Sequence, residues 1–285
     1  MGVSDPDELR SEIIERWERA AAGWGRRAER VREFGLPVSR WMVEHARLEP
    51  GLRVLELAAG PGDTGFLAAE LIRPGGTLIS SDAAETMLEV ARARAAELGL
   101  ENVEFKRIEL DWIDMETASV DRILCKWGLM FSVDPETALR EARRVLRPGG
   151  MITAAVWDEP AVNPWATITT RTLVELGYSE PADPDVPGGM FALAAPGRLQ
   201  DLLESAGFVD VRLDTVEPPR VFAGVEEYVA ETADLSSAFG SALRELSAQE
   251  RERVLEKVAE LASPYTAQDG TIDVPARSLV AVADA

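Results

Sequence analysis

The stretch RVLELAAGPGDTG, residues 53–65, decides the fold of this chain. It begins with an apolar run suited to a buried strand and continues through a glycine turn toward a predicted helix at about 64–71. Gly60, Gly62 and Gly65 fit the spacing G-x-G-x-x-G, in which glycines allow a sharp turn and a close approach of the backbone to a ligand. Asp82 ends the next apolar run, where an acidic side chain can accept hydrogen bonds from a ribose. The pattern predicts a site for a nucleoside cofactor.

The glycine pattern alone leaves the kind of cofactor open. It fits dinucleotides and other adenosine cofactors, and a strand-to-helix turn without any ligand can carry the same glycines. Glu56 lies inside the strand just before the turn, where a carboxylate would repel a pyrophosphate and attract an ammonium or sulfonium group. A second acidic segment, IELDW at 108–112, follows where the third strand should end. A positively charged adenosine cofactor is therefore favoured, with NAD as the alternative.

The charge balance argues against a nucleic-acid partner. The 285 residues include 50 Asp and Glu but 30 Lys and Arg, which gives a formal net charge of −20. Such a surface repels phosphate backbones, and the basic residues are mixed with Glu as on solvated helix faces. The chain has one cysteine and one histidine, which excludes an internal disulfide and a cysteine- or histidine-rich metal site. We therefore expect no bound metal.

Targeting and membrane signals are also missing from the sequence. The N-terminal MGVSDPDELR is acidic and polar, unlike a signal peptide. No apolar run is long enough to cross a bilayer. We expect a cytoplasmic protein without stable membrane insertion.

Strands and helices are predicted to alternate through the middle of the chain. This alternation indicates a doubly wound parallel sheet, in which ligand-facing loops lie at the carboxyl ends of the strands. The predicted strands are 53–58, 77–81, 103–108, 120–125 and 151–156, and the later ones are 208–216 and 278–283. The predicted helices between them are 64–71, 84–98 and 135–146, and 147–150 (RPGG) is a predicted turn.

The flanking segments are predicted to form a lid over that sheet edge. An N-terminal helix over 5–34, broken at Gly23 and Gly25, precedes a second helix at about 37–47. The fold expected is α/β, with a seven-stranded, mostly parallel, Rossmann-like sheet. Its predicted parts are an N-terminal helical lid (1–47), a cofactor-binding core (48–157), a lid insertion (158–194), a core continuation (195–222), a helical insertion (223–272) and a last core strand (273–285).

Four stretches, in this order, resemble the class I S-adenosylmethionine-dependent methyltransferases. The most similar group is the ubiquinone/menaquinone-biosynthesis type with its small-molecule relatives. The resemblance is good over roughly 48–157 and weaker at 1–47 and 195–216. The stretches are VLELAAGPGDTG (54–65), SSDAAETMLEVARARA (80–95), RIELDWIDMETASVDRILCKWGLMF (107–131) and LREARRVLRPGG (139–150).

The resemblance implies S-adenosyl-L-methionine as cofactor and S-adenosyl-L-homocysteine as product. It assigns the ribose to Asp82, the adenine edge and face to Glu109 and Leu110, and the neighbourhood of the reacting methyl to Lys126. The pair Asp111–Trp112 is the competing register for the adenine. The full set of implied cofactor residues is Glu56, Ala58, Gly60, Gly62, Asp82, Ala83, Met87, Glu109, Leu110 and Lys126, with Trp24 added from the lid.

Ala58 departs from the family pattern, because the acidic-x-Gly-x-Gly motif becomes Glu56-x-Ala58-x-Gly60 here. The extra methyl group should be tolerated where φ is negative.

The implied reaction is a direct displacement at an activated methyl group, which needs alignment and exclusion of water more than reacting side chains. The expected acceptor is a small, lipophilic or aromatic molecule. The predicted lid lining, which could equally be lid core, is Trp24, Trp41, Trp165, Met190, Phe191 and Phe239.

His45 is the weak candidate for a general base, against the alternative of a surface or capping histidine. The alternative functions are a non-catalytic cofactor binder of the same fold and an NAD-dependent oxidoreductase, and a homodimer is one option for assembly. The sequence does not indicate the acceptor, the methylated atom or the pathway.

Overall fold

The computed structural model describes residues 5–181, 183 and 186–285. The first four residues of the predicted N-terminal lid, and residues 182, 184 and 185 of the predicted lid insertion, lie outside this range. The strands are β1 (Arg53–Glu56), β2 (Thr77–Asp82), β3 (Val103–Arg107), β4 (Val120–Lys126), β5 (Leu146–Trp157), β6 (Val209–Val216), β7 (Val221–Phe222), β8 (Ile272–Asp273) and β9 (Ser278–Asp284).

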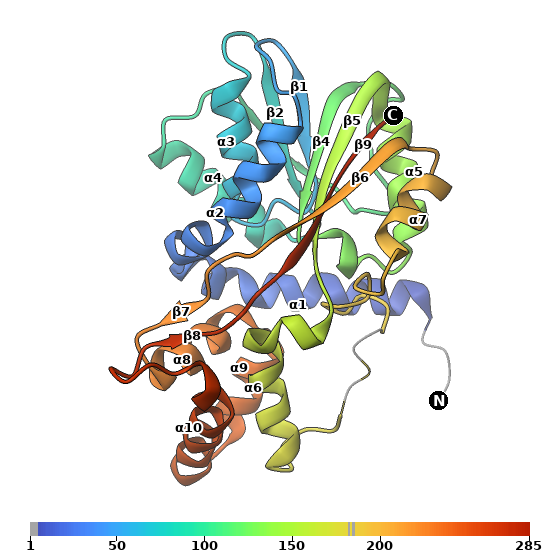
Figure 1. The fold of residues 1–285 in the computed structure, drawn as a ribbon. Coiled ribbons are helices and arrows are strands. Elements are labelled where there is room, and N and C mark those ends of the chain that lie inside the picture. Colours follow the sequence, from blue (N-terminus) through green and yellow to red (C-terminus); the bar gives the residue numbers. More distant parts are fainter. Residues whose placement is uncertain (1–4, 182, 184–185) are drawn as a thin grey trace.

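Seven of these strands, within the described part of the chain, form one sheet in the order β3-β2-β1-β4-β5-β9-β6 (Figure 1). β9 runs antiparallel to its neighbours β5 and β6, and the pairs among β1 to β5 are parallel. This confirms the predicted α/β fold with a mostly parallel seven-stranded sheet.

Helices cover both faces of the sheet. In Figure 1, α2, α3 and α4 lie on one side of the sheet, and α5 and α7 lie on the other. α1 runs across one end of the sheet, and α6, α8, α9 and α10 gather beyond it (Figure 1). The helices are α1 (Pro6–Arg26), α2 (Ala28–His45), α3 (Asp63–Leu71), α4 (Glu85–Glu97), α5 (Pro135–Val145), α6 (Pro164–Glu175), α7 (Arg198–Ser205), α8 (Val225–Leu235), α9 (Ser237–Glu245) and α10 (Ala248–Ala262).

The centre of the sheet is a switch point, because β1 pairs with β2 on one side and with β4 on the other. Leu55 lies opposite Ile79 of β2 and Ile123 of β4, and all three side chains are buried. Chain connections leave in opposite directions from such a point, so a crevice opens at the carboxyl ends of the strands. The apolar run around residues 53–58 therefore positions the site by forming a buried strand at the centre of the sheet.

The predicted boundary between the first two helices is wrong. α1 continues through Gly23 and Gly25, and the helical conformation is interrupted at Arg27. Pro37 lies inside α2. Gly23 serves packing instead, because a Cβ there would lie 1.9 Å from the carbonyl oxygen of Asp234 in α8. α2 tolerates its internal proline because its apolar face is buried against the core.

The RPGG segment is a distortion of a strand and not a free turn. β5 begins at Leu146 and runs through it, and the pairing with β4 shifts between Val120↔Leu146 and Arg122↔Met151. Gly149, at φ 78°, adopts the left-handed conformation that this bulge requires.

The helices beyond the sheet have a core of their own. Phe222, Tyr228, Val254 and Val258 are buried in a cluster that includes α8, α10 and the two-stranded sheet of β7 and β8. That small sheet was not predicted, because strands of two residues have no detectable periodicity. β8 spans the predicted boundary between residues 272 and 273.

The close contact at Gly23 generates a stability prediction. Gly23→Ala should lower the free energy of unfolding by about 2–3 kcal/mol, since the new methyl group meets backbone that cannot move aside. Gly25→Ala is the matched control, because its Cβ would meet the Val90 side chain at 3.3 Å and alanine favours a helix. Urea denaturation measures both, and equal effects of the two variants would contradict the packing assignment.

Candidate functional site

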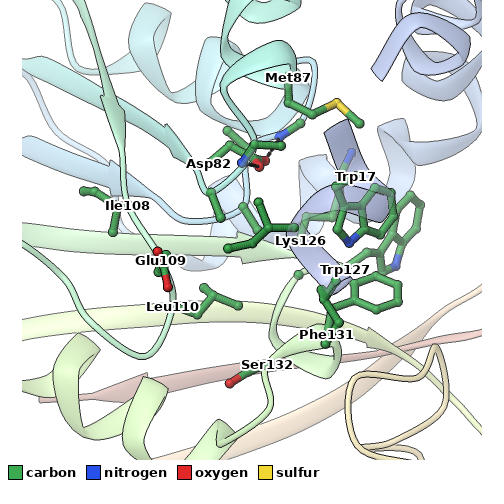
Figure 2. A pocket seen from close by; sticks show the side chains of 18 of the residues that line it. Trp17, Asp82, Met87, Ile108, Glu109, Leu110, Lys126, Trp127, Phe131 and Ser132 are labelled. Atoms are coloured by element: carbon green, nitrogen blue, oxygen red, sulfur yellow. Dashed lines mark hydrogen bonds between the residues drawn. The ribbon is translucent and has the colours of Figure 1, made fainter. Parts of the chain in front are cut away.

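A cavity lies at the carboxyl ends of β1, β2, β3 and β4 and is roofed by α1. Its empty space is about 1000 Å³, the solvent in its open mouth included. Figure 2 shows side chains from the loops after these strands and from α1 pointing toward one another around it. Its lining is Arg10, Ile13, Ile14, Trp17, Trp24, Val31, Ala58, Ala59, Gly60, Pro61, Asp63, Asp82, Ala83, Ala84, Met87, Ile108, Glu109, Leu110, Asp111, Lys126, Trp127, Gly128, Phe131, Ser132 and Val133.

Glu56 fixes the turn between β1 and α3 through hydrogen bonds of its buried carboxyl group. Its Oε1 accepts a hydrogen bond from the backbone N–H of Gly65 at 2.7 Å, and its Oε2 accepts one from Ser80 Oγ at 3.3 Å. A Cβ at position 65 would lie 2.2 Å from Oε2, which explains the third glycine of the motif. Burial raises the pKa of Glu56 to about 8. Glu56 is not among the cavity-lining residues, and neither is Gly62, which precedes α3 at φ 89°.

Asp82 holds the same turn from the side and lines the cavity. Its Oδ2 accepts from the backbone N–H of Gly60 at 2.9 Å, and its Oδ1 accepts from that of Ala84 at 3.0 Å. Burial raises the pKa of this carboxyl above its usual range, opposed by these backbone hydrogen bonds. A carboxylate has lone pairs left after two such bonds, so Asp82 can still accept from a ligand hydroxyl. Ala83 and Met87 continue the wall beside it.

Ala58 adopts a left-handed conformation, with φ 50°, so the assumption of a negative φ at this position is wrong. A left-handed non-glycine residue costs roughly 1–2 kcal/mol. Gly128, on the segment after β4, makes room for it, because a Cβ there would lie 2.3 Å from the Ala58 Cβ. The Ala58 methyl group therefore enters the cavity wall at the cost of local backbone strain.

The acidic segment after β3 lies at the cavity, and an arginine of α1 pairs with it. Glu109, Leu110 and Asp111 all line the cavity. Arg10 Nη2 donates to Asp111 Oδ2 at 3.1 Å, and its Nε lies 3.9 Å from Glu109 Oε2. Trp112, the second member of the alternative adenine register, is 72% exposed and does not line the cavity.

α1 is fixed over the cavity by polar and aromatic contacts. Glu18 accepts hydrogen bonds from the backbone N–H groups of Glu85 (2.8 Å) and Thr86 (3.1 Å), and so caps α4 from another helix. Trp24 Nε1 donates to the carbonyl oxygen of Leu235 in α8 at 3.0 Å. Trp17 packs edge-on against Trp24 and Phe131, with ring centroids 5.7 and 4.9 Å apart.

Of the six aromatic and methionine residues predicted to line the lid, Trp24 lines the cavity. The other five are packed in the hydrophobic clusters away from it: Trp41, Trp165, Met190, Phe191 and Phe239. Sequence reasoning missed Phe131 and Arg10. Their contribution depends on the path of α1 over the loop after β4, for which the sequence carries no separate signal.

The structure does not bring His45 to the cavity. It ends α2, its Nδ1 is 2.8 Å from the carbonyl oxygen of Trp41, and its ring stacks on the Trp41 ring at 4.0 Å. Cys125 is buried in the core, and burial raises the pKa of its thiol to about 12, which makes it a poor nucleophile. Within the described residues, no cluster of His, Cys, Asp and Glu is arranged to hold a metal ion. No described helix is long and apolar enough to cross a membrane.

Comparison with known proteins points to one family. Residues 48–175 match the family model described as a methyltransferase domain. The nocamycin O-methyltransferase of Saccharothrix syringae is 33% identical over 196 residues, which are 63% of this chain and 67% of that protein. The demethylmenaquinone methyltransferase of Lactococcus lactis is 30% identical over 176 residues, 56% of this chain and 67% of that protein.

A solved structure shares the fold at low sequence identity. The YcgJ protein of Bacillus subtilis superposes with a TM-score of 0.56 at 19% identity, covering 86% of this chain and 97% of its own.

The raised pKa of Glu56 generates a pH-dependence prediction. Its folded-state pKa of about 8 exceeds the ordinary 4.5, so its contribution to stability is full below about pH 4.5 and is lost as the pH rises toward 8. Glu56→Gln cannot ionise and can still accept from Gly65. The stability of the variant relative to the parent protein should therefore rise between pH 5 and pH 8, by on the order of 1 kcal/mol per pH unit.

Urea denaturation at several pH values measures this difference. Glu97→Gln, at an exposed position in the last turn of α4, is the control and should give a difference that does not change with pH. A flat difference for Glu56→Gln as well would contradict the buried, proton-binding state of Glu56.

Proposed function

This chain belongs to the S-adenosylmethionine-dependent methyltransferases, and we propose that it methylates a small, apolar or aromatic acceptor held between α1 and the loop after β4. The observation that carries the acceptor class is the composition of that part of the cavity. Ile13, Ile14, Trp17 and Phe131 line it, and a polar polymer would find few partners among them.

The cavity wall fits S-adenosylmethionine as cofactor. Asp82 supplies a carboxylate for the ribose hydroxyls next to the glycine turn, which leaves the backbone room to approach a ligand. Met87, Ile108 and Leu110 supply apolar surface for the faces of an adenine, and Glu109 supplies an acceptor at its edge. These residues come from the end of β2, the first turn of α4 and the loop after β3, so the nucleoside would lie along the carboxyl ends of neighbouring strands.

When bound, S-adenosylmethionine supplies a methyl group already activated by its sulfonium. The residues of this chain then have to align the acceptor and exclude water. Trp17, Trp24 and Phe131 form an aromatic wall on the α1 side, and Glu18 anchors α1 to the start of α4. We propose that this anchored roof keeps the acceptor pressed toward the reacting carbon.

The named relatives support a small-molecule acceptor. Two of them are named after nocamycin and demethylmenaquinone, which are small molecules. The net charge of −20 disfavours nucleic acid as the acceptor. Because His45 lies away from the cavity, an acceptor that needs deprotonation would have to use another group or an acidic proton of its own.

The cofactor proposal predicts selective binding in a calorimetric titration. S-adenosylhomocysteine and S-adenosylmethionine should bind, and NAD should not. Asp82→Asn should weaken the binding of S-adenosylhomocysteine by about 10–100-fold, since hydrogen bonds to a charged group contribute about 1.5–3 kcal/mol.

Asp114→Asn is the matched control, because Asp114 is exposed and outside the cavity lining. It should leave the affinity unchanged. Binding of NAD alone would refute the cofactor assignment, and full affinity in Asp82→Asn would refute the ribose assignment.

The acceptor proposal predicts turnover with small molecules. Incubation with S-adenosylmethionine and a panel of phenols, enols and quinols should release S-adenosylhomocysteine, detected by mass spectrometry together with the methylated acceptor. RNA and DNA should give no methylated product. Cofactor binding without turnover across the whole panel would favour the non-catalytic binder, and methylated nucleic acid would refute the acceptor class.

A further inference from the structure

We propose that the ammonium group of Lys126 binds the carboxylate of the cofactor's amino-acid portion. This inference rests on the proposed cofactor. The family resemblance implied only that Lys126 lies near the reacting methyl group, whereas the inference gives its side chain a binding role. It assigns the anionic end of the cofactor to a single residue at the end of β4.

The position of Lys126 is fixed by the central pairing of the sheet. Lys126 is the last residue of β4, which pairs with β1 directly before the glycine turn. The backbone N–H of Leu57 donates to the carbonyl oxygen of Leu124 at 2.8 Å, which keeps the two strand ends together. In Figure 2, the Lys126 side chain lies between Asp82 and the rings of Trp17 and Trp127.

The ammonium group is short of partners. Nζ donates one hydrogen bond, to Ser39 Oγ at 3.1 Å, and lies 4.9 Å from the centroid of the Trp127 ring. An ammonium has three N–H donors, so two are left for a ligand or solvent. Among the described residues Lys126 forms no ion pair, and the acidic groups that influence it, Asp63 and Glu56, act without a direct hydrogen bond to it.

The two acidic groups that act on Lys126 from farther away are already engaged. Glu56 accepts from Gly65 and Ser80, and Asp63 forms an ion pair with Arg94 at 2.8 Å. Burial lowers the pKa of Lys126, as expected for a cation whose desolvation is not compensated by a direct partner.

The surrounding helices leave space for this charge. Gly35 in α2 faces Nζ, and a Cβ at that position would lie 2.9 Å from it. Glycine inside a helix is less favourable than alanine, so this space lowers the stability of α2. Ser39 Oγ also lies 2.9 Å from Thr64 Oγ1, which joins this group to the first turn of α3.

The cavity lining holds more acidic than basic side chains, so a ligand carboxylate needs a cation close to it. The cations on the described lining are Arg10 and Lys126, and Arg10 is paired with Asp7 and Asp111. The start of α3 follows the glycine turn directly, and its positive dipole end also favours an anion. Lys126 is therefore the lining cation available to a ligand carboxylate.

The test compares two ligands that differ in the amino-acid portion. S-adenosylhomocysteine carries it, and 5′-methylthioadenosine has the same nucleoside and thioether without it. Calorimetry on Lys126→Met should show a loss of affinity for S-adenosylhomocysteine of about 10–100-fold, the range for a charged hydrogen bond. Affinity for 5′-methylthioadenosine should change less than about threefold, within the spread of single-mutant effects.

Two further variants keep the test decisive. Lys106→Met, at an exposed position on β3, should leave both affinities unchanged. Lys126→Arg should restore part of the affinity for S-adenosylhomocysteine, because it returns the positive charge. If Lys126→Met does not fold, Lys126→Gln replaces it, and retained binding of 5′-methylthioadenosine reports an intact nucleoside site.

Equal losses for the two ligands would overturn the proposal, since Lys126 would then only shape the cavity. Unchanged affinity for S-adenosylhomocysteine with loss of turnover would also overturn it and would make Lys126 a group that acts on the acceptor. Failure of the unmodified protein to bind S-adenosylhomocysteine would refute the proposed cofactor itself, a result independent of the variants.

Discussion

Two buried carboxyl groups, those of Glu56 and Asp82, hold the turn between β1 and α3, and the geometry of the whole site depends on them. Glu56 accepts from the N–H of Gly65 in the first turn of α3, and Asp82 accepts from the N–H of Gly60 in the middle of the loop. Glu56 ends β1 and Asp82 ends β2, and these two strands pair in parallel at the centre of the sheet. A loop fixed in this way presents its backbone to a ligand without having to reorganise on binding.

The same loop sets the position of the rest of the cavity. Ala58 is accommodated by Gly128 after β4, and Arg94 of α4 donates to the carbonyl oxygen of Pro61 at 2.6 Å. α1 then closes the cavity through two of its own residues: Glu18 accepts a hydrogen bond from the start of α4, and Trp24 donates one to the end of α8. The helical segment beyond the sheet therefore supports α1 as the roof of the cavity. The residues assigned to the cofactor come from the sheet edge, and the space proposed for the acceptor lies between that edge and α1.

Sequence patterns predicted the sheet, its helices and the cavity wall because each depends on local periodicity and spacing. Asp82, Glu109 and Lys126 line the cavity, as expected for residues at or just after the ends of parallel strands. Met87 lines it from the first turn of α4. The features that the sequence did not predict depend on contacts between residues far apart in the chain. Gly23 looks like a helix breaker in sequence, and only the approach of α8 shows that it is a contact point.

Other departures have the same origin. Glu56 was expected to contact the ligand, but it lies under the loop because Gly65 and Ser80 occupy its oxygens. The left-handed conformation of Ala58 follows from a turn shape that the spacing of glycines does not report. The path of α1 across the sheet edge decides which apolar side chains face the cavity and which pack in the helical core. The sequence does not determine this path by local periodicity.

A crystal structure of the protein with S-adenosylhomocysteine tests the central claim most directly. The account predicts the ligand in the cavity under α1, with the ribose hydroxyls on Asp82 and the carboxylate on Lys126, and with the turn at residues 58–63 unmoved. A ligand bound elsewhere, or a turn that has to rebuild around it, would contradict the claim that two buried carboxyl groups prepare this site in advance.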